Sequence, residues 1–271
     1  MSEATQARFR ARIRYIKHGR LAYLGHLELA HTIERIVRRA QLPYAVTQGF
    51  SPHMRVGFTS ALPVGTSSDA EYFDVFLTDY VAAPEALARL VAAAPEDLAP
   101  QELRYIDLRT PALTAEITRT VYRVDLSCAR LRITAAQLEG ALRVIASEGS
   151  IPYVRSGKAK TLDLVSTLVG FEVSRHTEAG PCTIVLDTRI SNDGALRPEI
   201  LIAALDRALT PDVEFEGPIV STGIQELHAF SRYSVTRTAQ YVEDADGSLL
   251  SPLRAGETTS APISVSSVPS L

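Results

Sequence analysis

Residues 19–58 read GRLAYLGHLELAHTIERIVRRAQLPYAVTQGFSPHMRVGF, and this stretch decides the fold that we predict for the 271-residue chain. Apolar residues recur at helical spacing from His26 to Ala40, which predicts a helix. Its core face is expected to consist of Leu27, Ala30, Ile33, Val37 and Ala40. Short strands are predicted after this helix, at 44–47 and 55–59, and an alternating strand before it, at 8–15.

The elements that follow complete the first half of the chain. A strand is predicted at 72–78, a helix at 84–94 and another strand at 102–108. The resulting βαββαβ order, with one extra short strand or bulge, is typical of a ferredoxin-like α+β sandwich. Residues 1–110 are therefore expected to form one ferredoxin-like half.

The second half repeats this order at an offset of about 109 residues. Pro152-Tyr153 corresponds to Pro43-Tyr44, and a strand at 121–127 precedes a helix at 134–147, for which Thr134 is the expected N-cap. A strand at 183–188 and a helix at 198–209 follow. The steady offset predicts an α+β fold of tandem duplicated ferredoxin-like units, with the second half at 119–220. Residues 243–271 are rich in Ser, Thr, Pro and Gly and are expected to form a disordered tail.

Charge is distributed unevenly along the chain. The whole chain has a net charge of −3, yet its first 60 residues hold ten Lys and Arg against three Asp and Glu. This asymmetry indicates a directed electrostatic surface. No apolar run approaches the ~20 residues that a bilayer span needs, and the first residues lack the apolar centre of a signal peptide. We therefore expect a cytoplasmic protein with no membrane partner.

The first strand suggests where the basic surface lies. Side chains alternate along a strand, so Arg8, Arg10, Arg12 and Arg14 share one face and are predicted to be solvent-facing. Phe9, Ile13 and Tyr15 should then point to the core. Guanidinium groups bind phosphates bidentately, which makes this face a candidate RNA contact. The alternative is a solvated face balanced by acidic neighbours such as Glu71 and Asp74.

A second candidate is the segment Gln48-Gly49-Phe50-Ser51-Pro52-His53. Gly49 and Pro52 favour a stiff bend that presents Phe50 and His53. An aromatic side chain on such a loop can stack on a base. The alternative is a buried Phe50 that closes one end of the sandwich.

The corresponding place in the second half holds Lys158 and Lys160, so both halves could contribute to one composite surface. The chain's RNA-binding candidates are Arg8, Arg10, Arg12, Arg14, Arg20, Arg35, Arg38, Phe50, His53, Arg55, Lys158 and Lys160. No catalytic residue is assigned, because Gly-rich phosphate loops, GxSxG elbows and paired catalytic carboxylates are absent from the sequence.

Metal ions and cofactors are not expected. His26 and His31 are five residues apart, about 140° around a helix, and cannot chelate one ion from the same face. Cys128 and Cys182 are the only cysteines and lie far apart in the sequence, so this chain alone cannot build a CxxC zinc site or an iron–sulfur cluster.

Several motifs resemble a known family. They are Gly19-Arg20-Leu21, Tyr23-Leu24-Gly25-His26-Leu27, Glu34-Arg35 with Arg38-Arg39-Ala40, Leu42-Pro43, Gly49-Phe50-Ser51-Pro52 and Leu62-Pro63-Val64-Gly65. Together they resemble the radical-SAM-linked protein family, an uncharacterised bacterial domain that is fused to radical S-adenosylmethionine (SAM) enzymes or separate from them. The resemblance covers roughly residues 8–220 and departs at Gly25, where a Ser is expected. It implies a radical SAM enzyme on a separate chain as the partner.

These observations favour an accessory protein that binds or presents RNA to a radical SAM enzyme, for modification or processing of tRNA or rRNA. One alternative is an RNA-modifying enzyme with the tandem fold of pseudouridine synthases, for which Asp163 and Asp74 are the candidate catalytic residues. The other is a purely protein-binding subunit. Whether the chain is an enzyme stays open, and its residues favour a non-catalytic role.

Overall fold

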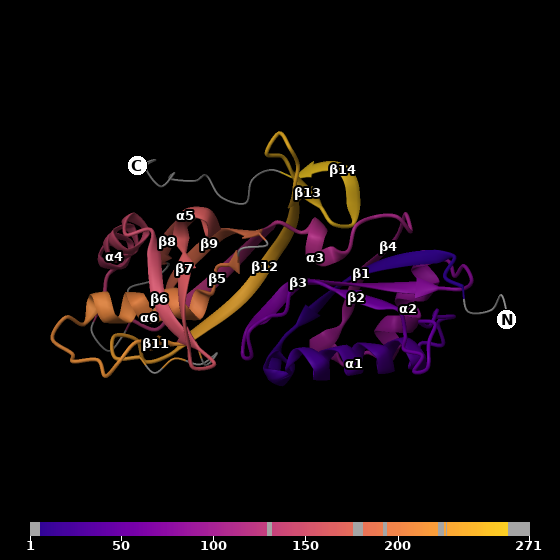
Figure 1. Ribbon diagram of the computed structural model, residues 1–271, viewed down its shortest axis with the longest axis horizontal. Helices are drawn as coiled ribbons and strands as arrows, with labels where there is room; N and C mark the ends of the chain where they lie inside the picture. Colours follow the sequence, from indigo (N-terminus) through magenta and orange to yellow (C-terminus); the bar gives the residue numbers. More distant parts are fainter. Residues whose placement is uncertain are drawn as a thin grey trace. The chain divides into compact units, whose positions relative to one another are not determined.

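The computed structural model has a mixed α+β fold (Figure 1). It describes residues 6–128, 132–175, 181–191, 194–221, 225 and 227–259. The chain divides into two compact units. Unit 1 runs to Ile117 and also contains Gln240–Thr259, while unit 2 begins at Thr118 and runs to Ala239. Within the described residues, no helix is both long and apolar enough to cross a membrane.

Unit 1 is built on a sheet with the order β2-β3-β1-β4, in which all neighbours are antiparallel. Its elements are β1 (Phe9–Lys17), the 3-10 helix η2 (Gly19–Tyr23), α1 (His26–Arg39), β2 (Val56–Phe58), β3 (Ser67–Leu77), α2 (Ala83–Ala93), the 3-10 helix η3 (Glu96–Leu98), β4 (Pro100–Ile106), and the short helix α3 (Leu113–Glu116). The order β1-α1-β2-β3-α2-β4 is the βαββαβ order that the sequence predicts for the first half.

Both faces of the unit 1 sheet are covered. Helices α1 and α2 pack on one face, over a core that includes Ile13, Ile33 and Phe73 (Figure 1). On the other face, Tyr72 packs in a smaller cluster with Leu113 of α3 and with Leu253. A central strand of this sheet therefore has little contact with solvent on either side.

Two local expectations for unit 1 are wrong. Leu27 is exposed, and the core face of α1 consists of Leu29, Ile33, Ile36 and Val37 instead. Residues two apart on a helix are about 200° apart, so Leu27 and Leu29 cannot share a face. The strand predicted at 44–47 is reduced to isolated bridges from Tyr44 to Leu77 and from Val46 to Met54.

Unit 2 has a different arrangement of strands. Its elements are β5 (Arg119–Leu126), α4 (Ala135–Ser147), β6 (Ser150–Arg155), β7 (Lys158–Asp163), the short helix α5 (Leu164–Thr167), β8 (Leu168–Arg175), β9 (Cys182–Ser191), β10 (Gly194–Ala195), α6 (Pro198–Leu209), β11 (Ile219–Val220), and the first part of β12 (Tyr233–Glu243). Strand β9 pairs with β5 and β8, while β6, β7 and β11 form a separate three-stranded sheet. The duplicated ferredoxin-like architecture is therefore not confirmed.

The capping of α4 agrees with the sequence. The Thr134 hydroxyl accepts a hydrogen bond from the Gln137 N–H at 3.2 Å, and the Gln137 side chain accepts one from the Thr134 N–H at 2.9 Å. This reciprocal pair satisfies two helix-end donors. Thr134 is confirmed as the N-cap.

The predicted disordered tail is ordered over its first part. Strands β13 (Leu249–Ser251) and β14 (Arg254–Thr259) pair with each other, and β13 also pairs with the end of β12. Leu249 and Leu253 are buried, so this segment contributes apolar area that its Ser- and Thr-rich composition conceals. Residues 260–271 lie outside the described residues.

Candidate nucleic-acid interface

The arginines of β1 do not form a solvent-facing stripe. Arg12 is completely buried and Arg10 is only 4% exposed, so the prediction that both face solvent is wrong. Arg14 is half-buried, with its Nε 3.9 Å from a Glu102 carboxylate oxygen. The physical reason is that both sheet faces are covered and that Asp74 lies directly opposite Arg12 on β3.

The guanidinium groups of Arg10 and Arg12 are engaged in buried hydrogen bonds. Arg12 donates to Asp74 Oδ1 at 2.8 Å, to Glu116 Oε2 at 2.7 Å and to the Pro252 carbonyl at 3.0 Å. Burial lowers the pKa of Arg12, but the hydrogen bond and charge of Asp74, followed by those of Glu116, outweigh burial and raise it. Arg10 donates to Asp74 Oδ2 at 3.0 and 2.6 Å. Neither side chain is available to a phosphate.

Arg55 is an exposed cation on this sheet face. Its guanidinium carbon lies 4.3 Å from the centroid of the Phe76 ring, and that of Arg10 lies 5.2 Å from the same centroid. The Phe76 N–H donates to the Arg55 carbonyl at 3.1 Å, which fixes the two residues side by side. Among the described carboxylates, none forms an ion pair with Arg55. Arg55 is thus a pre-positioned cation that remains open to a ligand.

A groove of about 430 Å³ adjoins Arg55, and we call it the Arg55 groove. The 54–58 segment lines it together with Phe76, Arg10 and residues 112–114. Its volume falls in the range of about 300–1,000 Å³ that is usual for small-molecule sites. The groove combines one exposed guanidinium with apolar and aromatic walls.

The loop before Arg55 presents an aromatic side chain to solvent. The Thr47 N–H donates to the His53 carbonyl at 2.8 Å, and the His53 N–H donates to the Thr47 hydroxyl at 3.0 Å, so the loop is closed at its base. Gly49 has a φ of +145°, which other residues rarely adopt. Phe50 is fully exposed, so the alternative in which it closes the sandwich is wrong.

The remaining candidates of unit 1 are not brought to this groove. Arg35 and Arg38 lie on α1, which covers the opposite face of the sheet, and Arg38 pairs with Glu34 at 3.2 Å. Arg20 is exposed on η2. Arg8 is exposed at the start of β1, and its N–H donates to the Leu77 carbonyl at 2.8 Å. His53 stays on the loop, 3.3 Å from the Ser51 hydroxyl.

Lys158 and Lys160 lie in unit 2, on the exposed hairpin formed by β6 and β7. Ser156 and Gly157 both have positive φ, as a tight hairpin turn requires. Arg155 lies directly opposite Lys158 across the two strands. Within the described residues, neither lysine has an ion-pair partner. The hairpin is therefore a basic surface that includes Arg155, which the sequence did not single out.

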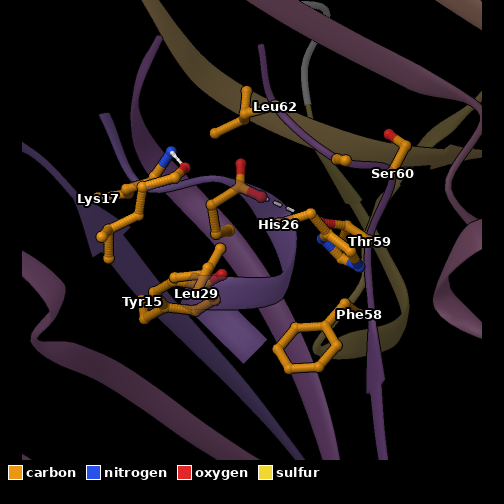
Figure 2. A pocket seen from close by; sticks show the side chains of 11 residues that line it. Tyr15, Lys17, His26, Leu29, Phe58, Thr59, Ser60 and Leu62 are labelled. Carbon is orange, nitrogen blue, oxygen red and sulfur yellow. Dashed lines mark hydrogen bonds between the residues drawn. The ribbon is translucent and has the colours of Figure 1, made fainter. Parts of the chain in front are cut away.

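A small polar pocket lies on the α1 side of unit 1 (Figure 2). Figure 2 shows Lys17 and His26 among the lining residues, with Tyr15 and Phe58 lower in the view. Its free volume of about 10 Å³ is close to the space that one water molecule needs. The Lys17 ammonium donates to the carbonyls of Ala22 and Leu24 at 2.9 and 3.2 Å. Lys17 thus stabilises the turn before α1, and the pocket is too small for a substrate.

The carboxylates considered for catalysis have structural contacts. Asp74 holds the two buried arginines of β1. Asp163 caps α5 and accepts hydrogen bonds from the Ser166 hydroxyl and N–H, which lower its pKa. In the part of the chain that the structure describes, no group of three His, Cys, Asp or Glu side chains could hold a metal ion.

The two cysteines, distant in sequence, are neighbours in unit 2. Both are buried free thiols. Burial, followed by a hydrogen bond to Cys128, raises the pKa of Cys182 to about 12. A thiol with such a pKa stays protonated and unreactive at neutral pH.

Residues 10–198 match the family described as an uncharacterized protein conserved in bacteria, DUF2344. The chain belongs to this family. A search among curated proteins gives no match. The DUF2344 region extends from β1 to the first residue of α6, so it contains the Arg55 groove, the Phe50 loop and the β6–β7 hairpin.

The sequence did not single out Phe76 as part of the site. Phe76 pairs with Arg10 across β1 and β3, so its role depends on the strand register. The available signal was the alternation of β3, in which Phe76 and Asp74 share a face and Val75 and Leu77 share the other.

Proposed function

We propose that this chain binds RNA through the Arg55 groove and the Phe50 loop and presents it to a radical SAM enzyme on a separate polypeptide. The observation that carries the proposal is an exposed guanidinium, stacked on Phe76, beside a loop that holds Phe50 in solvent. The substrate of the complex would be a tRNA or rRNA that is modified or processed.

The chemistry of the two features suits RNA. Proteins that bind single-stranded nucleic acids combine cations for the phosphates with aromatic side chains for the bases. Arg55 supplies the cation and Phe50 the stacking surface. Holding Arg55 against Phe76 reduces the side-chain entropy that is lost when a phosphate binds.

The partner half of the proposal rests on the motif resemblance to radical-SAM-linked proteins. Exposed apolar side chains in those motifs support a protein contact: Tyr23, Leu27 and Val64 are 61%, 73% and 43% exposed. The Tyr23 ring would lie 3.5 Å from a Cβ on Gly65, which places it next to Val64. We assign this surface to the radical SAM chain, whose cluster this chain would not supply.

Fluorescence anisotropy with a labelled tRNA tests the RNA half. We expect the Arg55→Ala variant to bind about tenfold more weakly than wild type, with a salt slope lower by about 0.7 for each phosphate that is no longer bound. The matched control is Arg89→Ala, which removes an exposed arginine from α2, where it pairs with Glu85. Wild-type protein that binds no RNA, or equal losses of affinity in the two variants, would contradict the proposal.

A further inference from the structure

A second hollow, at the end of β1 and β4, shares Arg10 with the Arg55 groove, and we call it the Arg8 pocket. It is lined by Arg8, Phe9, Arg10, Tyr105, Ile106, Asp107, Leu108 and Arg109, and its volume is also about 430 Å³. Arg10 lines both hollows. Side by side, the hollows could accept two neighbouring groups of one ligand.

Arg10 also fixes the chain segment that runs along both hollows. Its guanidinium donates to the carbonyls of Thr110 and Pro111. Residues 107–109 line the Arg8 pocket and residues 112–114 line the Arg55 groove, so the anchored dipeptide lies between them in the sequence. Arg10 is itself held by Asp74, so a buried, hydrogen-bonded side chain separates the two hollows.

Each hollow pairs exposed cations with an aromatic ring. In the Arg8 pocket, Arg8 and Arg109 are exposed, and ion pairs to either are absent from the described residues. Tyr105 packs 5.1 Å from Tyr80 and 6.2 Å from Phe9, and it donates to the Val81 carbonyl at 2.6 Å. In the Arg55 groove the corresponding groups are Arg55 and Phe76.

We infer that the two hollows take successive nucleotides of a single-stranded RNA segment, an inference that rests on the RNA binding proposed above. Bases of a duplex are stacked and paired inside the helix, so they can enter a recessed pocket only when they are unstacked. A duplex would present phosphates to the exposed arginines but would leave both hollows empty. The structure therefore favours unpaired RNA, such as a loop or a single-stranded end.

The test compares one labelled RNA as a single strand with the same strand annealed to its complement. We expect the single strand to bind at least tenfold more tightly than the duplex. The Arg55→Ala variant and the Arg8→Ala/Arg109→Ala double variant should each weaken single-strand binding severalfold. Each should also lower the salt slope by about 0.7 for every phosphate that the variant no longer binds. Arg89→Ala serves as the control, and thermal unfolding confirms that each variant is folded.

Each outcome bears on a distinct part of the account. Equal or tighter binding of the duplex overturns the single-strand inference but leaves RNA binding intact. Loss of affinity in Arg55→Ala, with none in Arg8→Ala/Arg109→Ala, overturns the two-hollow arrangement. Binding of neither RNA by wild-type protein overturns the proposed function and this inference with it.

Discussion

Strands β1 and β7 both carry basic residues at alternate positions, yet only β7 exposes them. Arg10 and Arg12 of β1 are buried against Asp74, whereas Lys158 and Lys160 of β7 are exposed. Strand β1 lies between β3 and β4 in a sheet that is covered on both faces, while β7 is the edge of a three-stranded sheet. Alternation therefore shows which side chains share a face, and the position of the strand in its sheet decides whether that face meets solvent.

The largest expected effect comes from removing the carboxylate of Asp74, which pairs with Arg10 and Arg12 of β1. Asp74→Ala leaves two buried guanidinium groups without their shared partner, and breaking a buried pair costs about 3–5 kcal/mol. Urea denaturation should show this loss of unfolding free energy, or the variant should fail to fold. A loss below about 1 kcal/mol would mean that the β1 arginines reach solvent after all.

Unit 2 holds a related buried pair that sharpens the comparison. Arg119 of β5 donates to Asp187 of β9 at 2.6 and 2.9 Å. We expect Asp187→Ala to destabilise the protein by about 3 kcal/mol, the lower end for a broken buried pair. Glu139→Ala is the control, because its ion pair with Arg143 is 41% and 47% exposed on the two side chains. Equal effects of the two changes in urea denaturation would refute the distinction between buried and exposed pairs.

Removing the exposed Phe50 ring should weaken RNA binding and leave the stability of the fold unchanged. Phe50→Ala should weaken RNA binding by about tenfold, since stacking on one base contributes about 1–3 kcal/mol. The unfolding free energy should change by less than about 0.5 kcal/mol, because the ring is fully exposed. Anisotropy and urea denaturation measure the two quantities. A large loss of stability with unchanged affinity would indicate a structural role.

Removing the β7 lysines should leave stability unchanged, whereas removing the partner of the β1 arginines should lower it. Lys158→Ala/Lys160→Ala should leave the unfolding free energy within about 0.5 kcal/mol of wild type. The double variant should also relieve some repulsion, because Arg155 lies directly opposite Lys158 and like charges across strands destabilise a sheet. If the hairpin binds RNA, the salt slope should fall by about 0.7 for each phosphate involved. A marked loss of stability would show that β7 is not a solvated edge.

The smallest expected effect concerns pH. Hydrogen bonds from Ser166 lower the pKa of Asp163, so this carboxylate stabilises the fold above its ordinary pKa, and the contribution is lost as pH falls through the lowered value. Ser166→Ala removes the hydroxyl donor and should move the Asp163 pKa toward its usual range. NMR titration of the carboxyl carbon measures it. An unchanged pKa would mean that the hydroxyl makes no difference.

Local patterns predicted the elements whose stability comes from neighbouring residues. Helices α1, α2, α4 and α6 lie within one or two residues of the predicted bounds, and Thr134 caps α4 through a contact three residues away. Strands β8 and β12 were missed, as was the hairpin of β13 and β14. Strand β14 reads RAGETT, so it has no alternation of apolar residues that would indicate a strand.

The sequence predicted the candidate site only in part, because several of its contacts join residues far apart in the chain. Composition and turn residues made Arg55 and the Phe50 loop candidates, but the burial of Arg12 depends on Asp74, 62 residues further along the chain. The role of Phe76 depends on the register of β1 with β3. Neither long-range pairing has a signal within a single window of sequence.

Photo-crosslinking tests the central claim most directly. A single-stranded RNA that contains 4-thiouridine would be bound to the full chain and irradiated, and the attached peptides would be identified by mass spectrometry. The account predicts adducts within residues 47–58 and 105–114, which contain Phe50 and Arg55 and line the two hollows. Adducts confined to α1 or to other surfaces, with none in these two segments, would contradict it.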